Sequence, residues 1–406
     1  MTTLRDQNVH DAASLRAAMV SELREMDAIT SEPVAAAVAT VPRHLFALGE
    51  PIEAAYAANK ALVIKRDPDG MALSSLSATH IQAAMLEQAE ITPGMRVMEV
   101  GSGGYNAALI QELVGDSGRV TSVDIDPDIV ARARTCLAAA GYNHVEVVLA
   151  DAENGVPEGA PYDRIIITAG AWDIPPAWIE QLSDRGRIVV PLRLRGLTRS
   201  IAFDRTSDEV GLVSHSYRLS GFVKMQGSGS YSERVIPLDE GVALRVDEEP
   251  QQFNVEALQE ALHSARLERW SGAAYDLPDE LELFLMTSVP APQVALLHAS
   301  KELIDQGRFA PSAARGVPAL ISGGSFAYRT RRKNEEAGGF ESGVFAHGPE
   351  AEAVAAQYVE LLRRWASDHR RRGAARIQYI PEATGAAEPS QGLVAKRHGV
   401  VAVSWS

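Results

Sequence analysis

Residues 97–106, which read Val-Met-Glu-Val-Gly-Ser-Gly-Gly-Tyr-Asn, indicate the fold class of this chain. An apolar run ends at Val100, and a glycine-rich turn leads directly into a helical pattern that begins near Tyr105. Glycines in such a turn let the backbone approach a ligand closely, and the first N–H groups of the helix are free to bind polar groups. The segment therefore predicts a strand, a ligand-binding turn and a helix in succession.

Short apolar runs and amphipathic helical patterns alternate on both sides of this turn. The apolar runs cover residues 96–100, 119–123, 145–149, 162–168 and 187–191, and the clearest helical patterns cover residues 127–140 and 176–182. Alternation of this kind is typical of a parallel sheet whose strands are joined by right-handed helical crossovers. The predicted fold class is therefore α/β, with a Rossmann-like sheet.

Two carboxylates are predicted to lie at the same edge of the sheet as the glycine turn. Asp124 ends the next strand, 20 residues after Gly104, where a carboxylate can bind both hydroxyls of a ribose. Asp151 follows the strand after that. Ligands bind at the carboxyl ends of such strands, so these features converge on one crevice. Either aspartate taken alone could equally be a helix cap or a turn residue.

The order of the glycines distinguishes two nucleotide-like cofactors. Gly101, Gly103 and Gly104 form the pattern Gly-x-Gly-Gly, which differs from the Gly-x-Gly-x-x-Gly pattern of dinucleotide-binding turns. Glu99 precedes the turn, where its carboxylate suits the cationic methionine end of S-adenosylmethionine but would lie close to the pyrophosphate of NAD. The sequence therefore favours S-adenosyl-L-methionine over NAD.

The predicted cofactor site combines the turn with the ends of the next three strands. Its glycines, with Glu99, are expected beneath the methionine and ribose, Asp124 at the ribose, and Asp151 with Ala152 at the adenine. The complete predicted set is Glu99, Val100, Gly101, Ser102, Gly103, Gly104, Asp124, Ile125, Asp151, Ala152 and Thr168.

Five segments between Val41 and Val190 resemble the protein-L-isoaspartate O-methyltransferase family. They are residues 41–46 (Val-Pro-Arg-His-Leu-Phe), 76–80 (Leu-Ser-Ala-Thr-His), 92–103 (Thr-Pro-Gly-Met-Arg-Val-Met-Glu-Val-Gly-Ser-Gly), 156–169 and 174–182. The resemblance implies a seven-stranded class I methyltransferase domain with N-terminal helices. It also implies that Ser77 donates a hydrogen bond that orients a substrate carboxylate, and that His80 supports the loop around Ser77.

The chain departs from the family pattern at two positions. One residue is missing between Gly103 and Gly104, and Thr79 replaces a proline after Ser77. Neither change removes a chemical group, so we expect activity to be retained. The shortened turn nevertheless leaves a non-catalytic, donor-binding scaffold as an alternative of a different class.

Three parts are expected along the chain: an N-terminal helical, substrate-side segment (1–75), a cofactor-binding domain (76–230) and an additional C-terminal α+β domain (235–406). The last part has short expected strands at 252–255 and 294–297. Residues 221–229 and 396–405 resemble an actinobacterial branch of the family that is associated with ribosomally made, modified peptides such as lanthipeptides. That likeness implies methylation of an aspartyl carboxylate in a modified precursor peptide, leading to succinimide or isoaspartate. Repair of isoaspartyl proteins is the alternative.

Composition limits the partners and the cellular location. Of the 406 residues, 39 are basic and 53 are acidic, and the acidic surplus lies in residues 1–299, which argues against nucleic-acid binding. Apolar runs are shorter than the roughly 18 residues of a membrane span, and the N-terminus lacks a secretory pattern. Cys136 is the single cysteine, and the histidine spacing fits no metal site. We expect a cytoplasmic protein that binds a peptide, without a metal, a membrane or a predictable oligomeric state.

Overall fold

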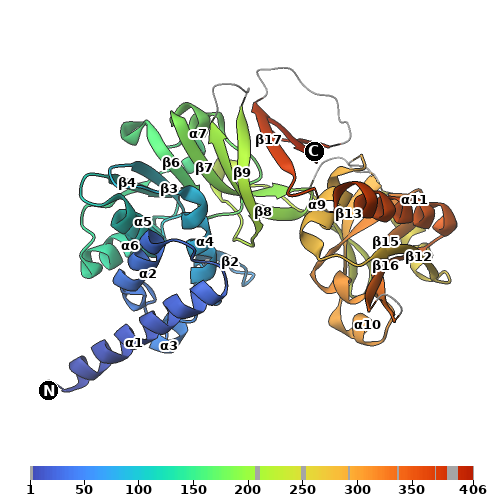
Figure 1. Ribbon diagram of the computed structural model, residues 1–406, viewed down its shortest axis with the longest axis horizontal. Coiled ribbons are helices and arrows are strands. Elements are labelled where there is room, and N and C mark those ends of the chain that lie inside the picture. The colour runs from blue at the N-terminus through green and yellow to red at the C-terminus, as the bar shows by residue number, and fades with distance from the viewer. Residues whose placement is uncertain are drawn as a thin grey trace. The chain divides into compact units, whose positions relative to one another are not determined.

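The chain folds into two compact units in the computed structural model (Figure 1). The structure describes residues 3–205, 211–247, 253–290, 293–335, 338–370, 372–381 and 392–405. The first unit comprises Met1–Arg193 and Thr198–Tyr231, and the second comprises Leu194–Leu197 and Ser232–Ser406. The division after Tyr231 lies close to the expected boundary between residues 230 and 235, whereas residues 1–75 belong to the first unit.

The first unit begins with helices and a hairpin. The elements are α1 (Thr3–Glu25), α2 (Glu32–Thr40), the 3-10 turn η1 (Arg43–Phe46), α3 (Ile52–Ala55), β1 (Leu62–Arg66), β2 (Ala72–Leu76) and α4 (Thr79–Ala89). Ser31 caps α2, because its hydroxyl accepts the N–H of Val34 at 3.4 Å. Strands β1 and β2 pair antiparallel.

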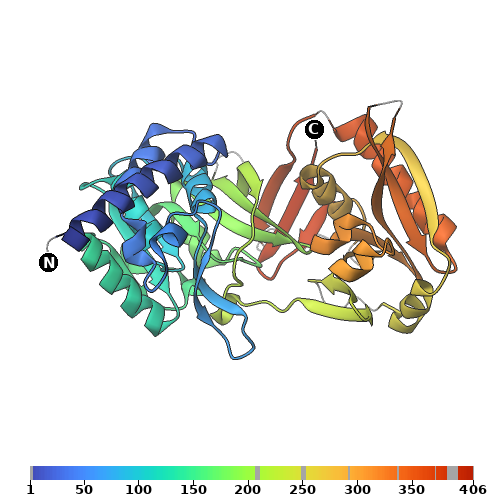
Figure 2. The same ribbon diagram turned by 90° about the horizontal axis from the view of Figure 1, so that it is seen from below.

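Seven strands of one sheet form the centre of the first unit (Figure 2). These seven strands follow the spatial order β5-β4-β3-β6-β7-β8-β9, in which β3 to β7 are parallel and β8 and β9 are antiparallel to each other. This arrangement confirms the predicted α/β class I methyltransferase fold. The strands are β3 (Arg96–Val100), β4 (Arg119–Asp124), β5 (Glu146–Leu149), β6 (Tyr162–Ile167), β7 (Leu182–Leu194), β8 (Leu197–Arg205) and β9 (Leu212–Leu219).

Helices α5 (Tyr105–Val114), α6 (Pro127–Ala140) and α7 (Pro176–Glu180) connect these strands. Helix α6 has the bounds that the sequence predicts, because Asp126 caps its first turn at the N–H of Asp128 (2.9 Å) and Gly141 ends it with a φ of +88°. None of the helices in the described part of the chain is long and apolar enough to cross a membrane.

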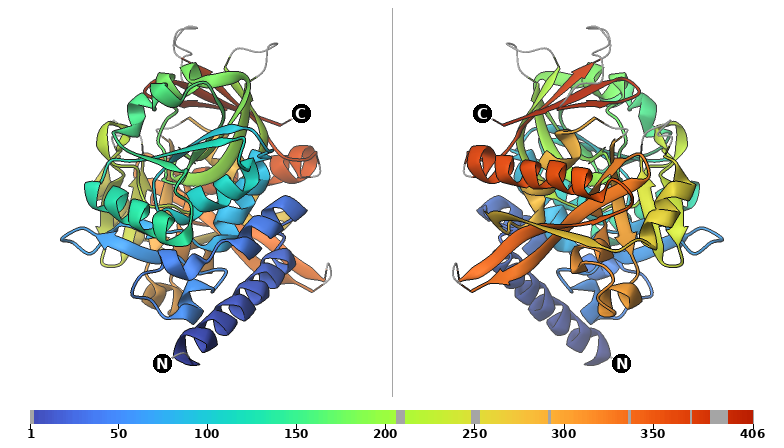
Figure 3. Two further views of the ribbon diagram at one scale, coloured as in Figure 1. Left: turned by 90° about the vertical axis from the view of Figure 1, so that its left-hand side faces the viewer. Right: turned by 90° about the vertical axis from the view of Figure 1, so that its right-hand side faces the viewer.

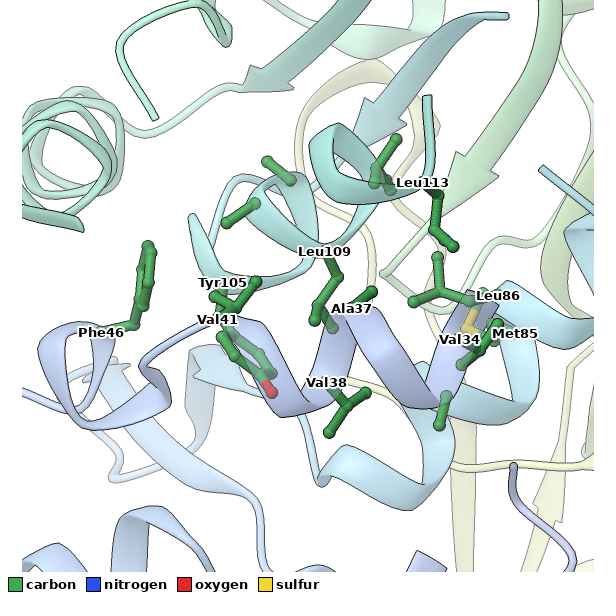
Figure 4. Close-up of a cluster of buried hydrophobic side chains, with 14 of the residues drawn as sticks. Val34, Ala37, Val38, Val41, Phe46, Met85, Leu86, Tyr105, Leu109 and Leu113 are labelled. Atoms are coloured by element: carbon green, nitrogen blue, oxygen red, sulfur yellow. The ribbon is translucent and has the colours of Figure 1, made fainter. Parts of the chain in front are cut away.

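A buried apolar cluster fixes α5, whose first turn follows the glycine turn. Figure 4 shows Ala37 of α2 beside Leu109 of α5, and Val34 of α2 beside Leu86 of α4. Val34, Val38 and Leu86 are almost inaccessible to solvent, and burial of a side chain of this size stabilises the fold by about 1.5–3 kcal/mol. The N-terminus of α5 is therefore anchored by apolar packing.

The second unit is built around an antiparallel sheet with the order β10-β11-β13-β14-β15-β16-β12, in which β15 and β16 form a long hairpin (Figure 3). It confirms the additional C-terminal α+β domain. The strand expected over residues 252–255 is wrong for its described residues, because Asn254 instead caps α8 at the N–H of Ala257 (3.1 Å). The elements are β10 (Arg234–Asp239), β11 (Val242–Val246), α8 (Val255–Leu262), β12 (Leu267–Ala274), α9 (Pro278–Thr287), β13 (Val294–Ala299), α10 (Lys301–Asp305), β14 (Val317–Ser322), β15 (Ser325–Asn334), β16 (Gly339–His347), α11 (Ala351–Arg364), β17 (Arg376–Pro381), β18 (Leu393–Ala395) and β19 (Gly399–Ser404).

Candidate active site

The turn after β3 has a conformation that requires glycine. Gly101 has a φ of +97°, and its N–H donates to the carbonyl of Val123 at 2.8 Å. A Cβ atom at Gly101 would lie 2.4 Å from Thr168 Oγ1, which itself donates to the carbonyl of Val100 at 2.9 Å. Gly104 has a φ of +84° at the start of α5. The turn is therefore held between the ends of β4 and β6.

A pocket opens at the carboxyl ends of β3, β4 and β6. This position is where the strand order reverses, at which sheets of this type bind ligands. Eight residues of the predicted cofactor site line it: Val100, Gly101, Gly103, Asp124, Ile125, Asp151, Ala152 and Thr168.

Asp124 lies between two backbone segments of this pocket. Its Oδ2 accepts the N–H of Ser102 at 2.8 Å, and its Oδ1 accepts the N–H of Asp126 at 2.9 Å. Burial nevertheless raises the pKa of Asp124 above its ordinary value, because it disfavours the charged form. Since a carboxylate can accept about four hydrogen bonds, Asp124 retains acceptor capacity for a pair of ribose hydroxyls.

Asp151 ties the pocket to a distant part of the chain. Its Oδ1 accepts the N–H of Glu153 at 3.1 Å, and its Oδ2 accepts the N–H of Ser228 at 2.9 Å. Burial alone would raise the pKa of Asp151, but the N–H groups of Ser228 and Glu153 outweigh that effect and hold the pKa below its ordinary value. Asp151 is therefore expected to stay ionised beside the pocket.

Residues 223–229, which we call the covering segment, contribute Val223 to Gln226 to the lining of the pocket. The N–H of Gly170 donates to the carbonyl of Val223 at 2.8 Å, and the N–H of Met225 donates to the carbonyl of Gly170 at 3.1 Å. Gln226 Nε2 donates to the carbonyl of Leu73 in β2 at 3.2 Å. The segment is thus attached both to the loop after β6 and to the β1–β2 hairpin.

Several residues of the pocket were not predicted from the sequence. They are Leu73, Ser74, Ser75, Val123, Ile129, Ala169, Val223, Lys224, Met225 and Gln226. Most of these come from the hairpin or from the covering segment, far along the chain from the glycine turn. The Gly/Ser-rich residues 226–230 offered one signal, but they lie at the end of the cofactor-binding domain expected over residues 76–230 and are typical of a boundary loop.

The other three residues of the predicted cofactor site, Glu99, Ser102 and Gly104, are not among the residues that line the pocket. Glu99 is fully buried, and its two carboxylate oxygens accept hydrogen bonds from Asn106 Nδ2 (2.9 Å) and from Ser122 Oγ (2.5 Å). Burial raises the pKa of Glu99 to about 7. In this structure Glu99 connects β3 to β4 and to the first turn of α5, while its proposed place at the methionine end stays a prediction.

Ser77 and His80 also lie outside the pocket lining, in and after the turn between β2 and α4. Ser77 does not cap the helix, since Ala78 occupies the N-cap position. His80 Nδ1 lies 3.2 Å from the carbonyl of Ala58. A Cβ atom at Gly103 would lie 3.7 Å from Leu76 Cδ1, so the end of β2 lies directly against the glycine turn. The substrate-side role of Ser77 and His80 remains a prediction.

Within the described residues, no group of three or more His, Cys, Asp or Glu side chains could hold a metal ion. The arrangement instead fits S-adenosylmethionine. The glycine turn leaves the space that a side chain would fill, Asp124 offers ribose acceptors, and Ile125, Ile129 and Val100 provide apolar lining for a base.

Comparison with known proteins places this site in a family. The family model described as protein-L-isoaspartate(D-aspartate) O-methyltransferase matches residues 14–225. Protein-L-isoaspartate O-methyltransferase 2 of Archaeoglobus fulgidus is 44% identical over 163 residues, which are 40% of this chain and 71% of that protein. The protein-L-isoaspartate O-methyltransferase of Methanococcoides burtonii is 40% identical over 187 residues, covering 46% of this chain and 87% of that protein.

A solved structure titled protein-L-isoaspartate O-methyltransferase extends the likeness of fold beyond the first unit. It has a TM-score of 0.50 and 20% identity, and the match covers 96% of this chain and 99% of that chain. Since the family model spans more than half of the sequence and includes every residue of the pocket except Gln226, the chain belongs to the protein-L-isoaspartate(D-aspartate) O-methyltransferase family and is a carboxyl methyltransferase that uses S-adenosylmethionine.

Proposed function

We propose that this enzyme methylates the free carboxylate of L-isoaspartyl residues in polypeptides. The observation that carries the proposal is the convergence of eight predicted residues on one pocket within residues 14–225, the part of the chain that the family model covers. Relatives that match this part at 40% identity or more bear the name protein-L-isoaspartate O-methyltransferase.

The reaction requires the protein to align the methyl donor with the acceptor carboxylate more than to act as an acid or a base. When bound, S-adenosylmethionine supplies its methyl group to a carboxylate oxygen, while the methyl carbon–sulfur bond breaks and its electron pair stays on sulfur. Because the acceptor is already ionised, no general base is needed. Holding two reactants in line can contribute about 7–11 kcal/mol. In this proposal Asp124 binds the ribose, Asp151 and Ala152 face the adenine, and Ser77 orients the acceptor carboxylate.

The methyl ester makes a further step possible without the enzyme. The backbone nitrogen that follows the ester can attack its carbonyl carbon, lose its proton and expel the methoxy group as methanol. The product is a succinimide, and water opens the ring to aspartate or isoaspartate. Repeated cycles would convert isoaspartate to aspartate, which is the chemical basis of repair.

Methylation of an aspartyl carboxylate in a modified precursor peptide is the second candidate. Two observations favour it: residues 221–229, which resemble the peptide-modifying branch, include the covering segment, and a second unit is present. A fold match over 96% of this chain with a structure titled protein-L-isoaspartate O-methyltransferase weakens the second argument. The isoaspartyl substrate is therefore our main proposal.

A comparison of acceptors tests the choice. The full chain is incubated with S-adenosylmethionine and one of three acceptors: an isoaspartyl peptide, the same peptide with aspartate, and a modified precursor peptide. Intact-mass analysis should show one added methyl group on the isoaspartyl peptide alone. Methylation of the precursor peptide without the isoaspartyl peptide would overturn the proposal, and donor binding without S-adenosylhomocysteine formation would indicate a scaffold.

A further inference from the structure

Arg43 is a buried cation close to the substrate-side turn. Its side chain is inaccessible to solvent, and its Nε donates to the carbonyl of Ala55 at 2.8 Å. Nη1 donates to Gln82 Oε1 at 2.9 Å, and Nη2 donates to the carbonyl of Ser77 at 2.7 Å. Among the described residues no carboxylate forms an ion pair with it, so every hydrogen bond that it makes here goes to an uncharged oxygen.

The same guanidinium also contacts the start of α5. Its central carbon lies 4.6 Å from the ring centre of Tyr105, the first residue of that helix. Phe46, at the other end of the η1 turn, would lie 3.1 Å from a Cβ atom at Gly104, so its ring packs on the glycine turn. One short turn of chain therefore contacts both the Ser77 backbone and the donor-binding turn.

Burial of a cation at this position is energetically unfavourable if its side chain does no more than fill space in the core. Removal of a charge from water costs several kcal/mol, and this cation lacks the opposite charge that usually offsets the cost. Burial indeed lowers the pKa of Arg43 below its ordinary value. What a guanidinium offers instead is a rigid, planar set of donors, which can fix several acceptors relative to one another.

We propose that Arg43 is a positioning residue that holds the Ser77 backbone in register with the first turn of α5, so that the acceptor carboxylate at Ser77 and the methyl donor at the glycine turn are aligned. This inference rests on the proposed function, because that function assigns Ser77 to the acceptor. Arg43 itself contacts neither reactant. Its effect should therefore appear in the methyl-transfer step and not in donor binding.

Arg43→Lys tests the inference, because lysine keeps the charge but cannot reach three separate acceptors in a fixed plane. We expect kcat for an isoaspartyl peptide to fall about 10- to 100-fold, as for small misalignments of reactants, and the affinity for S-adenosylhomocysteine to change less than about twofold. Amide hydrogen exchange in residues 76–80 should become faster.

Arg187→Lys is the matched control. Arg187 is only 6% exposed and donates to the carbonyl of Gln88 (2.7 Å) and to Asp204 (2.6 Å), at the opposite end of the strands from the pocket. The control should lower the unfolding temperature while leaving kcat and exchange in residues 76–80 unchanged. Arg43→Lys could also lower the unfolding temperature and leave both kcat and the exchange in residues 76–80 unchanged. Arg43 would then be purely structural, and the inference would be overturned.

Two further readouts keep the test decisive. If Arg43→Lys fails to fold, Gln82→Met can be used instead, because it removes one hydrogen-bond acceptor of Arg43. We expect Gln82→Met to lower kcat by a smaller factor than Arg43→Lys. An unchanged kcat in Gln82→Met would count against the inference. Should the wild-type enzyme not methylate an isoaspartyl peptide, the proposed function fails. Exchange in residues 76–80 would then still decide whether Arg43 holds the turn.

Discussion

Gly101 and Thr168 face each other so closely that a methyl group on Gly101 would lie 2.4 Å from Thr168 Oγ1. Gly101→Ala would therefore push apart the ends of β3 and β6, and would also place alanine at a φ of +97°, a strain of about 1–3 kcal/mol. Since 1.4 kcal/mol corresponds to tenfold in affinity, we expect roughly 10- to 100-fold weaker binding of S-adenosylhomocysteine by titration calorimetry.

Gly141→Ala is the matched control for this substitution. Gly141 also has a positive φ, +88°, but it lies after α6 and outside the pocket lining, and a Cβ atom there would meet nothing within 4 Å. The variant should lose stability through backbone strain, while its affinity for S-adenosylhomocysteine stays within about threefold of the wild-type value. Equal losses of affinity for the two variants would contradict the close contact with Thr168 as the cause.

Gly227 places the covering segment against the pocket. It has a φ of +72°, and a Cβ atom there would lie 2.5 Å from Ile125 Cδ1 and 2.7 Å from Asp151 Oδ2. Gly227→Ala should displace the segment and weaken donor binding about tenfold, with the unfolding temperature little changed. Gly221→Ala, which meets no atom within 4 Å, should bind the donor normally. Normal binding by Gly227→Ala would show that the segment contributes nothing to the site.

The buried carboxyl of Glu99 should make stability depend on pH. Its pKa is raised from an ordinary value of 4.5 to about 7, so the folded protein retains a proton that the unfolded chain releases between these values. The resulting stabilisation is complete below about pH 4.5 and is lost as pH rises through about 7.

Glu99→Gln removes this titration while keeping an amide that can bond to Asn106 and Ser122. Relative to Glu99→Gln, the wild type should lose about 2–3 kcal/mol of its free energy of unfolding between pH 5 and pH 8. Urea unfolding across this range measures it. A difference that is constant with pH would mean that Glu99 is ionised throughout.

Ser77→Ala tests the substrate-side assignment. Ser77 lies in the turn after β2 and does not cap α4, so its hydroxyl is not required for that helix. We expect kcat/KM for an isoaspartyl peptide to fall about 10- to 100-fold, as for loss of a hydrogen bond to a charged group, while donor affinity is unchanged. An unchanged kcat/KM would remove Ser77 from the acceptor site.

Local signals in the sequence predicted the parts of the fold that local interactions determine. Helix α6 begins and ends where Asp126 and Gly141 indicate, and β3 has the bounds of the predicted run over residues 96–100. Spacing along these elements was enough to bring Asp124 and Asp151 to one pocket, because parallel strands end at the same edge.

The remaining parts of the site depend on contacts between distant segments. The covering segment contacts the pocket through hydrogen bonds from Ser228 to Asp151 and from Gln226 to Leu73. The sequence pattern of residues 223–229 does not predict these hydrogen bonds. The partners of Glu99 likewise come from α5 and β4. A carboxylate that the sequence predicts to bind a ligand can thus form hydrogen bonds within the protein itself.

Transfer of a methyl group to an isoaspartyl carboxylate is the central claim, and a single-turnover intact-mass experiment tests it most directly. Excess enzyme is mixed with S-adenosylmethionine and an isoaspartyl peptide, and both peptide and nucleoside products are followed with time. We expect one methyl ester and one S-adenosylhomocysteine per peptide, with slower formation in Arg43→Lys than in Arg187→Lys. An enzyme that binds the donor but leaves the isoaspartyl peptide unmethylated would contradict it.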